Sequence, residues 1–392
     1  MQEMKKILTI VAEYPPYCVG GIGLNAYDLN CHVDSKKYEM ITITFTMIEE
    51  MQIKKLNETI YIGIPQQNVV VEKSYEEKYI CQNKDIIQAF EKIQNQRLID
   101  FNDVELIILH GYFLAGAAVH VANKLKKPLL YYLHVQYASK LYNKNVISYD
   151  EYNILKKANA VIAVSEFVLN EANKMSGIIN KSKIIAKALE FDYIENISEI
   201  QRDEHLFLYV GRLSEEKGIE VLFEAFTKYC KDNDKAKLYC IGTFVNDEYR
   251  ENIIKKYFSD NELNRNVIFI GNKSRESIYR YMKIARAIIV PSYNETFGKV
   301  AVEAMACKCL AIVSDVGGLG PLVTDRRTGF KFHKGNDEEL YKILRTIGDF
   351  NVDKIIEEAY EYAIANYTWQ KIIAESNQFI FEKIGIASLY EE

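Results

Sequence analysis

The sequence contains no apolar run close to the ~20 residues that a membrane-spanning helix needs, so the protein is not expected to cross a bilayer. Near its start, Ile7–Ala12 follows a basic flank as in a signal peptide, but the run is too short for that role and Glu13 ends it. The run predicts a first core strand instead. Peripheral contact with a membrane stays open.

The sequence also lacks a large excess of charge of one sign, because the formal net charge is only -5 and is spread almost evenly over the two halves. A nucleic-acid-binding protein needs a basic patch, so nucleic acid is not expected as a partner. The seven cysteines are scattered, odd in number and without a CxxC pair, which indicates reduced thiols in a cytoplasmic protein. No histidine cluster accompanies them, so they predict no metal site.

Short apolar runs alternate with helical patterns along most of the chain, which predicts doubly wound parallel sheets. The expected strands are Ile7–Ala12, Met40–Phe45, Glu105–His110, Leu129–His134 and Ala160–Ser165 in a first series, and Leu206–Val210, Lys237–Ile241, Val267–Ile270, Ala287–Val290 and Leu310–Val313 in a second. A polar stretch around Glu195–Glu204 separates the series. We therefore expect an α/β protein with two Rossmann-like domains, residues 1–197 and 198–367, facing a cleft that binds ligands beyond the strand ends.

The last segment, 368–392, carries apolar residues at helical spacing from Ile372 to Ile384, and Thr368 precedes them as a candidate N-cap. This pattern predicts a helix. Periodicity alone leaves open whether its apolar stripe closes the second domain or returns to the first.

The segment Pro291–Glu303 follows a buried strand and leads into a helix of small residues after Gly298. The first N–H groups of such a helix attract phosphate, and a glycine lets a ligand approach the backbone. Glu295 and Glu303 are expected to flank this place, where carboxylates accept hydrogen bonds from sugar hydroxyls. In the alternative, Glu295 only complements the helix dipole and Glu303 is a solvated surface residue.

A second loop, Gly211–Gly218, also lies between a core strand and an amphipathic helix, here Ile219–Tyr229. Arg212 and Lys217 in this loop are expected on the cleft side. Two cations there would neutralise the charge of a diphosphate leaving group as it develops. The alternative is that both are solvated surface residues.

Together the two motifs resemble the family 4 retaining glycosyltransferases of the GT-B fold. Glu295 and Glu303 match the E-x7-E signature of that family, and Gly211-Arg-Leu with Lys217-Gly218 matches its other loop. The resemblance implies a nucleotide-sugar donor, with UDP as the family's usual nucleotide. It also implies that the C-terminal helix returns to the first domain.

Carried over residue by residue, the resemblance implies that Arg212 and Lys217 bind the donor pyrophosphate, that Glu303 binds the ribose hydroxyls, and that Glu295 contacts the transferred sugar. Backbone groups are expected to complete the donor site, namely those of Phe297, Gly298, Lys299 and Val300.

The loop Tyr14–Gly23 resembles the N-terminal glycine loop of the family. Gly20 and Gly21 would let main-chain amides approach the donor phosphates or the acceptor, just before a helix expected from about Leu24. The spacing G-x-G-x-x-G is absent, which disfavours a nicotinamide cofactor.

His134 ends the expected strand Leu129–His134. The residues alone favour a packed, hydrogen-bonded histidine, but the family places a histidine of this strand beside the donor sugar. The resemblance therefore implies a catalytic role for His134 together with Glu295. His110 ends the preceding strand and has a weaker claim.

The chain departs from the family pattern at Ala158-Asn159, where Ala-Asp is common, and at Lys187–Asp192, where a turn of another sequence is usual. Asp232-Asn-Asp234 is a literal DxD sequence, but it lies between an expected helix and strand and predicts a surface loop. No metal and no cofactor are expected, because Arg212, Lys217 and a helix dipole supply the neutralising charge.

The sequence and the resemblance together predict a cytoplasmic hexosyltransferase that moves a hexose or N-acetylhexosamine to an acceptor hydroxyl, and the resemblance implies retention and a UDP-sugar donor. Glycans, lipid-linked glycans, proteins and small molecules all stay open as acceptors, and the unusual region Thr46–Arg97 is expected to shape the acceptor pocket. Two alternatives also stay open: a sugar-nucleotide epimerase of the same architecture, and an inactive partner subunit that binds the donor.

Overall fold

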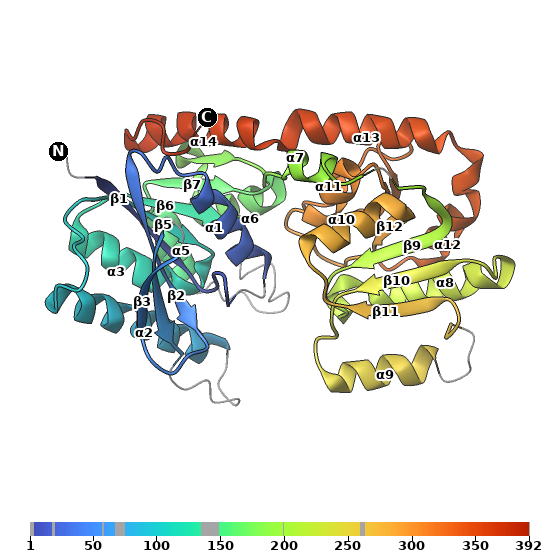
Figure 1. Cartoon of the computed structure of the whole chain (residues 1–392), viewed down its shortest axis with the longest axis horizontal. Coiled ribbons are helices and arrows are strands. Elements are labelled where there is room, and N and C mark those ends of the chain that lie inside the picture. Colours follow the sequence, from blue (N-terminus) through green and yellow to red (C-terminus); the bar gives the residue numbers. More distant parts are fainter. Residues whose placement is uncertain are drawn as a thin grey trace. The chain divides into compact units, whose positions relative to one another are not determined.

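The computed structural model describes residues 4–17, 20–56, 59–66, 75–134, 149–198, 200–258 and 263–391. They form two compact units (Figure 1). Unit 1 comprises Met1–Lys187 together with Ile372–Glu392, and unit 2 comprises Ala188–Lys371. The division falls earlier in the chain than the expected boundary after residue 197. Leu189, which was expected in the first domain, belongs to unit 2 because its N–H donates to Tyr367 O of that unit at 2.8 Å.

Unit 1 contains, in its described part, an eight-stranded sheet of order β3-β4-β2-β1-β5-β6-β7-β8. All neighbouring strands are parallel except β3 and β4, which form an antiparallel edge. The strands are β1 (Lys5–Val11), β2 (Tyr38–Thr46), β3 (Gln52–Leu56), β4 (Thr59–Pro65), β5 (Val104–His110), β6 (Leu129–Leu133), β7 (Ala160–Ala163) and β8 (Ser182–Ile184). Nearly all residues of β2, β5 and β6 are buried, as in a parallel sheet that is covered on both faces.

The helices of unit 1 connect these strands. In α6 (Glu166–Ser176), Ser165 is the N-cap and its Oγ accepts a hydrogen bond from Val168 N at 3.3 Å, and Gly177 ends the same helix in the left-handed region. The helices are α1 (Gly21–Cys31), α2 (Tyr75–Asn95), α3 (Ala115–Leu125), α5 (Tyr149–Lys157), α6 (Glu166–Ser176) and, from Ile372 onward, α14 (Trp369–Ile384).

Unit 2 has a six-stranded parallel sheet in its described part, of order β11-β10-β9-β12-β13-β14. The strands are β9 (Asp203–Val210), β10 (Lys237–Ile241), β11 (Val267–Gly271), β12 (Ala285–Val290), β13 (Leu310–Ser314) and β14 (Phe330–Phe332). The helices are α7 (Phe191–Glu195), α8 (Ile219–Asp232), α9 (Asp247–Tyr257), α10 (Arg275–Ile284), α11 (Lys299–Ala306), α12 (Asp337–Thr346) and α13 (Val352–Tyr367). Phe207, Phe223 and Phe226 are fully buried in its core.

Each sheet has one point at which the strand order reverses. In unit 2 the chain moves outward from β9 to β11 and then returns to the other side of β9 with β12. In unit 1 the same reversal separates β1 from β5. Ligands of open α/β sheets bind beyond the carboxyl ends of the strands at such a switch point. In unit 2 a ligand is therefore expected at the loops after β9 and β12.

The expected strands of both series are all present, as are the two doubly wound parallel sheets. Four strands were not anticipated, namely β3, β4, β8 and β14. The antiparallel strand β3 corrects the expectation of purely parallel sheets; its residues alternate between exposed and half-buried because it lies at an edge. Of the helices that the structure describes, none combines the length and the apolar character needed to cross a bilayer.

Candidate functional site

Two loops of unit 2 meet at its switch point. One joins β9 to α8 and contains Arg212 and Lys217, and the other joins β12 to α11 and contains Glu295. A backbone hydrogen bond from Tyr293 N to Glu216 O, 3.0 Å long, links the loops. The motifs therefore lie together in space, because the two loops follow the neighbouring strands β9 and β12.

Gly218 allows the close approach of the loops. Its φ is +66°, and a Cβ built at this position would lie 1.9 Å from the carbonyl oxygen of Pro291. Only glycine therefore fits both the left-handed backbone and the contact with the neighbouring strand end. The first loop is held against the second by this contact.

Lys217 and Glu295 form an ion pair across the two loops. Their side chains are 24% and 19% exposed, so the pair is partly shielded from water but not sealed from it. Ser292 Oγ also donates to Glu295 Oε1 at 3.3 Å, and Ser314 Oγ in turn donates to Ser292 O at 2.6 Å. The Glu295 carboxylate is thus a fixed acceptor that lies beside a cation.

Arg212 is arranged differently from Lys217. Its side chain is 58% exposed, and its Nη2 lies 2.6 Å from Glu216 Oε1. The backbone is held by Tyr209, whose hydroxyl donates to Arg212 O at 2.6 Å. The position of the residue is therefore fixed, whereas its exposed guanidinium is held by a surface ion pair of small stabilising value.

The start of α11 lies in the same region. Gly298 is the N-cap with φ +97° and ψ 43°, and as a glycine it has no side chain that could cap the helix. Because the first N–H groups of a helix have no acceptor within it, this end is suited to bind phosphate oxygens. Phe297 is buried and packs edge-on against Tyr367 at 5.9 Å, so its side chain belongs to the core and only its backbone is offered to a ligand.

Glu303 lies one turn into α11, and its side chain is only 12% exposed, which contradicts the alternative of a solvated surface residue. Tyr279 Oη donates to Glu303 Oε1 at 3.3 Å, and Lys299 Nζ lies 4.0 Å from the same oxygen. Burial and the nearby Glu303 raise the pKa of Tyr279, so its hydroxyl stays protonated as a donor. The Glu303 carboxylate is held in one orientation.

Sequence reasoning missed three residues that hold this site, namely Ser292, Glu216 and Tyr279. Ser292 and Glu216 lie inside the two motifs, so the sequence could have indicated them as polar neighbours able to hydrogen-bond Glu295 and Arg212. Tyr279 lies on α10, far from either motif, and no local pattern marks it.

In unit 1, His110 and His134 lie side by side at the carboxyl ends of β5 and β6. His110 Nδ1 is 3.0 Å from His134 Nε2, and the rings are 2% and 1% exposed. Tyr132 stacks on His110 with ring centroids 4.7 Å apart, and its hydroxyl pairs with that of Tyr390 at 2.8 Å. Among the described residues, His134 Nδ1 has no hydrogen-bond partner although it is buried. The sequence identified both histidines but not their pairing.

Burial and the nearby Lys187 lower the pKa of His110 to about 3, and the same causes, with His110 added, lower that of His134 well below 6.5. One neutral ring must then donate to the other through a single proton. Unfolded histidine titrates near 6.5, so below this pH the unfolded chain binds more protons than the folded one. Stability is therefore present at neutral pH and is lost as the pH falls.

We expect the free energy of unfolding to fall by about 1.4 kcal/mol per pH unit for each of the two histidines between about pH 6.5 and 4. Urea unfolding of the wild type and of His110→Phe, which keeps a stacking ring, measures this slope at a series of pH values. His110→Phe should lose the contribution of one histidine to this pH dependence of the free energy of unfolding. His205→Asn, at an exposed position, should keep the pH dependence of the wild type. Equal slopes in all three proteins would contradict the burial of neutral histidines.

Gly20 and Gly21 lie where α1 begins, which corrects the expected start near Leu24. Gly20 is the N-cap with an extended backbone, and its N–H donates to Glu13 Oε2 at 2.7 Å. A Cβ at Gly21 would meet no atom within 4 Å. The loop is therefore anchored by Glu13, and a role of the two glycines in binding a substrate stays a prediction.

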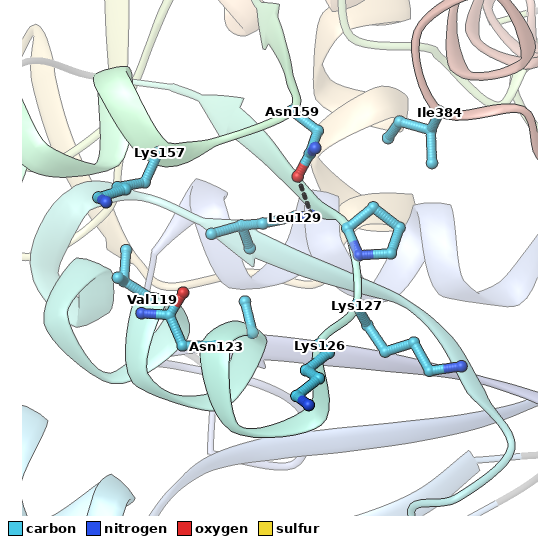
Figure 2. A pocket seen from close by; sticks show the side chains of 10 residues that line it. Val119, Asn123, Lys126, Lys127, Leu129, Lys157, Asn159 and Ile384 are labelled. Carbon is cyan, nitrogen blue, oxygen red and sulfur yellow. Dashed lines mark hydrogen bonds between the residues drawn. The ribbon is translucent and has the colours of Figure 1, made fainter.

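Unit 1 has a hollow of about 510 Å³ at the amino ends of β6 and β7, the edge opposite to the two histidines. Figure 2 shows that its lysines, Lys126, Lys127 and Lys157, point in different directions rather than toward one another. Asn159 Oδ1 accepts a hydrogen bond from Leu129 N at 2.9 Å there. Asn159, which departs from the family pattern, thus links the start of β6 to the start of β7 and lies outside the candidate site.

Metal ligands do not gather in the described part of the chain, where no three His, Cys, Asp or Glu side chains form a cluster. Asp232 of the DxD sequence ends α8, and its Oδ2 accepts from Tyr341 Oη at 2.9 Å. With its side chain 54% exposed, it lies at a surface connection, as predicted.

Comparison with known families agrees with the two units. The model for glycosyl transferases group 1 matches residues 190–362, and that for glycosyltransferase family 4 matches residues 63–188. The chain belongs to the family 4 glycosyltransferases. The candidate loops of unit 2 lie within the first of these matches.

Relatives of this glycosyltransferase are spread over archaea and bacteria. An uncharacterized glycosyltransferase of Methanocaldococcus jannaschii is 27% identical over 382 residues, which cover 97% of this chain and 96% of the relative. The alpha-monoglucosyldiacylglycerol synthase of Streptococcus pneumoniae is 25% identical over 291 residues, or 67% of this chain and 64% of the relative.

Solved structures share the fold of the glycosyltransferase. Sucrose-phosphate synthase from Thermosynechococcus elongatus is similar with a TM-score of 0.80 at 21% identity, covering 96% of this chain and 99% of that chain. Anabaena HepE in complex with UDP-glucose is similar with a TM-score of 0.73 at 18% identity, covering 97% and 99%. The GT-B fold that the sequence predicted is thereby confirmed.

Proposed function

We propose that this glycosyltransferase transfers a hexose or N-acetylhexosamine, with retention, from a UDP-sugar to the hydroxyl of an acceptor. The observation that carries the proposal is the convergence of Lys217, Glu295 and the start of α11 at the switch point of unit 2. A cation and the first N–H groups of a helix suit a diphosphate, and the adjacent carboxylate suits sugar hydroxyls.

In this proposal Arg212 and Lys217 neutralise the diphosphate, together with backbone N–H groups of the segment Phe297–Val300. Glu303, held by Tyr279, accepts hydrogen bonds from the ribose hydroxyls. Each of these groups acts without a bound metal, because the side chains and the helix start supply the positive charge.

Glu295 contacts the transferred sugar in the same scheme. Its ion pair with Lys217 brings the sugar-binding carboxylate next to the phosphate-binding cation, as a sugar diphosphate requires. The catalytic role of His134 rests on the family resemblance and stays a prediction. With its pKa lowered by burial, this histidine acts as a neutral hydrogen-bonding group rather than as a cation.

The reaction breaks the bond between the anomeric carbon and the diphosphate oxygen and forms a bond from that carbon to the acceptor oxygen. The acceptor proton passes to the departing phosphate oxygen on the same face of the sugar, which gives retention without a carboxylate nucleophile.

UDP as the nucleotide is supported by the fold-related HepE, whose structures contain UDP and UDP-glucose. The free state of the six described cysteines supports a reducing, cytoplasmic location.

A thermal-shift panel of nucleotides and nucleotide sugars tests the donor assignment. A ligand that binds only the folded chain raises the melting temperature, by an amount equivalent to about 2.7 kcal/mol at a concentration of 100 Kd. We expect UDP and a UDP-hexose or UDP-N-acetylhexosamine to stabilise the protein more than ADP or GDP do, with or without EDTA. Stabilisation that needs a divalent cation would contradict the metal-free scheme.

Product analysis by NMR then separates the reaction classes. Retention predicts that the anomeric configuration of the product equals that of the donor, with one UDP released per transfer. An inverted product would contradict the same-face route. An isomeric nucleotide sugar formed without free UDP would identify an epimerase, and donor binding without turnover on any acceptor would identify an inactive partner subunit.

A further inference from the structure

The hollow of about 510 Å³ at the amino ends of β6 and β7 is not part of the proposed donor site, because the loops of that site belong to unit 2. Its wall is formed by the end of α3, the start of β6, the connection from α5 to β7 and the end of α14. The chain on either side of every lining residue also belongs to the described part. The volume falls within the range of small-molecule sites.

Three lysines surround this hollow. Lys126 and Lys127 follow α3, and Lys157 ends α5, so their charges complement the negative ends of these helices. None of the three forms an ion pair or a side-chain hydrogen bond with another residue of the described ranges. Their ammonium groups are therefore able to bind an external anion.

Other lysines at the same edge of the sheet bind the chain itself. Lys181 Nζ donates to Ala158 O at 2.7 Å and to Lys156 O at 2.8 Å. Lys156 Nζ donates in turn to Ser176 O at 2.8 Å. These two lysines satisfy backbone carbonyls at helix ends, a structural role that the three lysines of the hollow do not share.

The three ammonium groups of the hollow diverge. Figure 2 shows Lys126, Lys127 and Lys157 on different sides of the hollow, with side chains directed away from one another. A single compact anion such as phosphate would contact one of them at a time. Anionic groups that are spaced along one chain can contact all three, each at its own ammonium group.

The remaining lining suits sugar rings. Asn123 is exposed, and its amide can donate to and accept from hydroxyls. Asn159 Oδ1 accepts from Leu129 N at 2.9 Å, which fixes the orientation of this exposed amide and makes its Nδ2 the group able to donate to a ligand hydroxyl. Val119 and Ile384 add apolar surface, on which the C–H groups of a sugar ring can pack.

We propose that this hollow is a binding site for an acidic glycan, a chain of sugars that carries carboxylate, sulfate or phosphate groups. Anionic groups of the glycan contact Lys126, Lys127 and Lys157, and hydroxyls of the rings between them are bound by Asn123 and Asn159. The hollow lies at the edge of the sheet opposite to the two histidines, so this site attaches the enzyme to an acidic polymer without occupying the candidate catalytic groups. The assignment does not depend on the proposed donor.

Isothermal titration calorimetry on the full chain tests the assignment with oligosaccharides of equal length: a sulfated heparin fragment, an oligogalacturonate and a neutral maltooligosaccharide. At least one acidic oligosaccharide should bind, about tenfold or more tightly than the neutral one. Its affinity should fall as the salt concentration rises, because the lysines are accessible to solvent. Lys126→Gln/Lys157→Gln should weaken this binding about tenfold or more, because two charge-assisted contacts are lost.

Lys235→Gln/Lys342→Gln is the matched control, because it removes the same charge from two exposed lysines of unit 2. This control should bind the acidic oligosaccharide as the wild type does. Both double variants should keep the melting temperature of the wild type within a few degrees, because exposed lysines add little stability.

Four results would overturn the proposal: no acidic oligosaccharide binds, the neutral one binds equally well, the two double variants bind alike, or an anion without sugar rings binds at least as tightly as the acidic glycans. The anions to compare are tripolyphosphate, an oligoglutamate and vesicles of anionic phospholipid. They represent a free phosphate, an acidic protein and a membrane as the alternative ligands of the hollow.

Discussion

Replacing Lys217 with alanine is expected to lower kcat/KM for sugar transfer by about 10²–10³-fold, the usual cost of removing one group that stabilises charge in a transition state. The variant loses the cation that faces the leaving diphosphate, and it leaves the partly buried Glu295 carboxylate without its ion pair. Steady-state kinetics with saturating acceptor measure the effect, which should fall mainly on kcat because the charge develops during the reaction.

Lys228→Ala is the matched control for this prediction. Lys228 also pairs with carboxylates, Asp337 and Glu338, but these lie at the start of α12, away from the two candidate loops. The control should lose at most a little stability and keep its kcat/KM. Kinetics of Lys217→Ala within about threefold of the control would remove Lys217 from the mechanism.

Gly218→Ala is expected to destabilise unit 2 by at least about 3 kcal/mol and to abolish donor binding. Two costs add at this position: the left-handed backbone at φ +66°, and a Cβ 1.9 Å from the carbonyl oxygen of Pro291. Relief of the contact requires the end of β12 to move, and this movement displaces the loop that carries Glu295. Urea unfolding and the UDP-induced thermal shift measure the two effects.

Gly271→Ala separates the two costs in the same unit. Gly271 has a similar φ of +74°, but a Cβ there would meet no atom within 4 Å. This control should lose only about 1–2 kcal/mol, the cost of the left-handed backbone. Equal destabilisation of the two variants would show that contact between the loops is not what requires a glycine at residue 218.

The ion pairs of the candidate site explain how its charges are kept in position. Lys217 and Glu295 neutralise each other across two loops, and Arg212 is paired with Glu216. In the proposed reaction the diphosphate replaces the carboxylates as the anionic partner of Lys217 and Arg212, and neutral sugar hydroxyls donate to Glu295 in place of Lys217. The loops themselves are held by backbone contacts, such as that from Tyr293 to Glu216, which a change of ion-pair partners leaves intact.

The sequence alone predicted the elements that depend on local pattern. Apolar runs of β-rich residues marked the strands of both parallel sheets, because residues buried on both faces leave no polar alternation. The order of strand, loop and helix then predicted that Arg212, Lys217, Glu295 and Gly298 lie at carboxyl strand ends. Strands β3, β8 and β14 escaped detection because each is short and lies at an edge of its sheet, and β3 and β8 are also partly exposed.

Only the tertiary structure decided which of these residues act on one another. The pairing of Lys217 with Glu295, the support of Glu303 by Tyr279, and the contact of His110 with His134 each join elements that are distant in the chain. Such contacts depend on the order and register of the strands, and a local pattern of residues carries no information on either. The sequence therefore determined the chemistry available at each strand end, and the packing of the strands determined which groups meet.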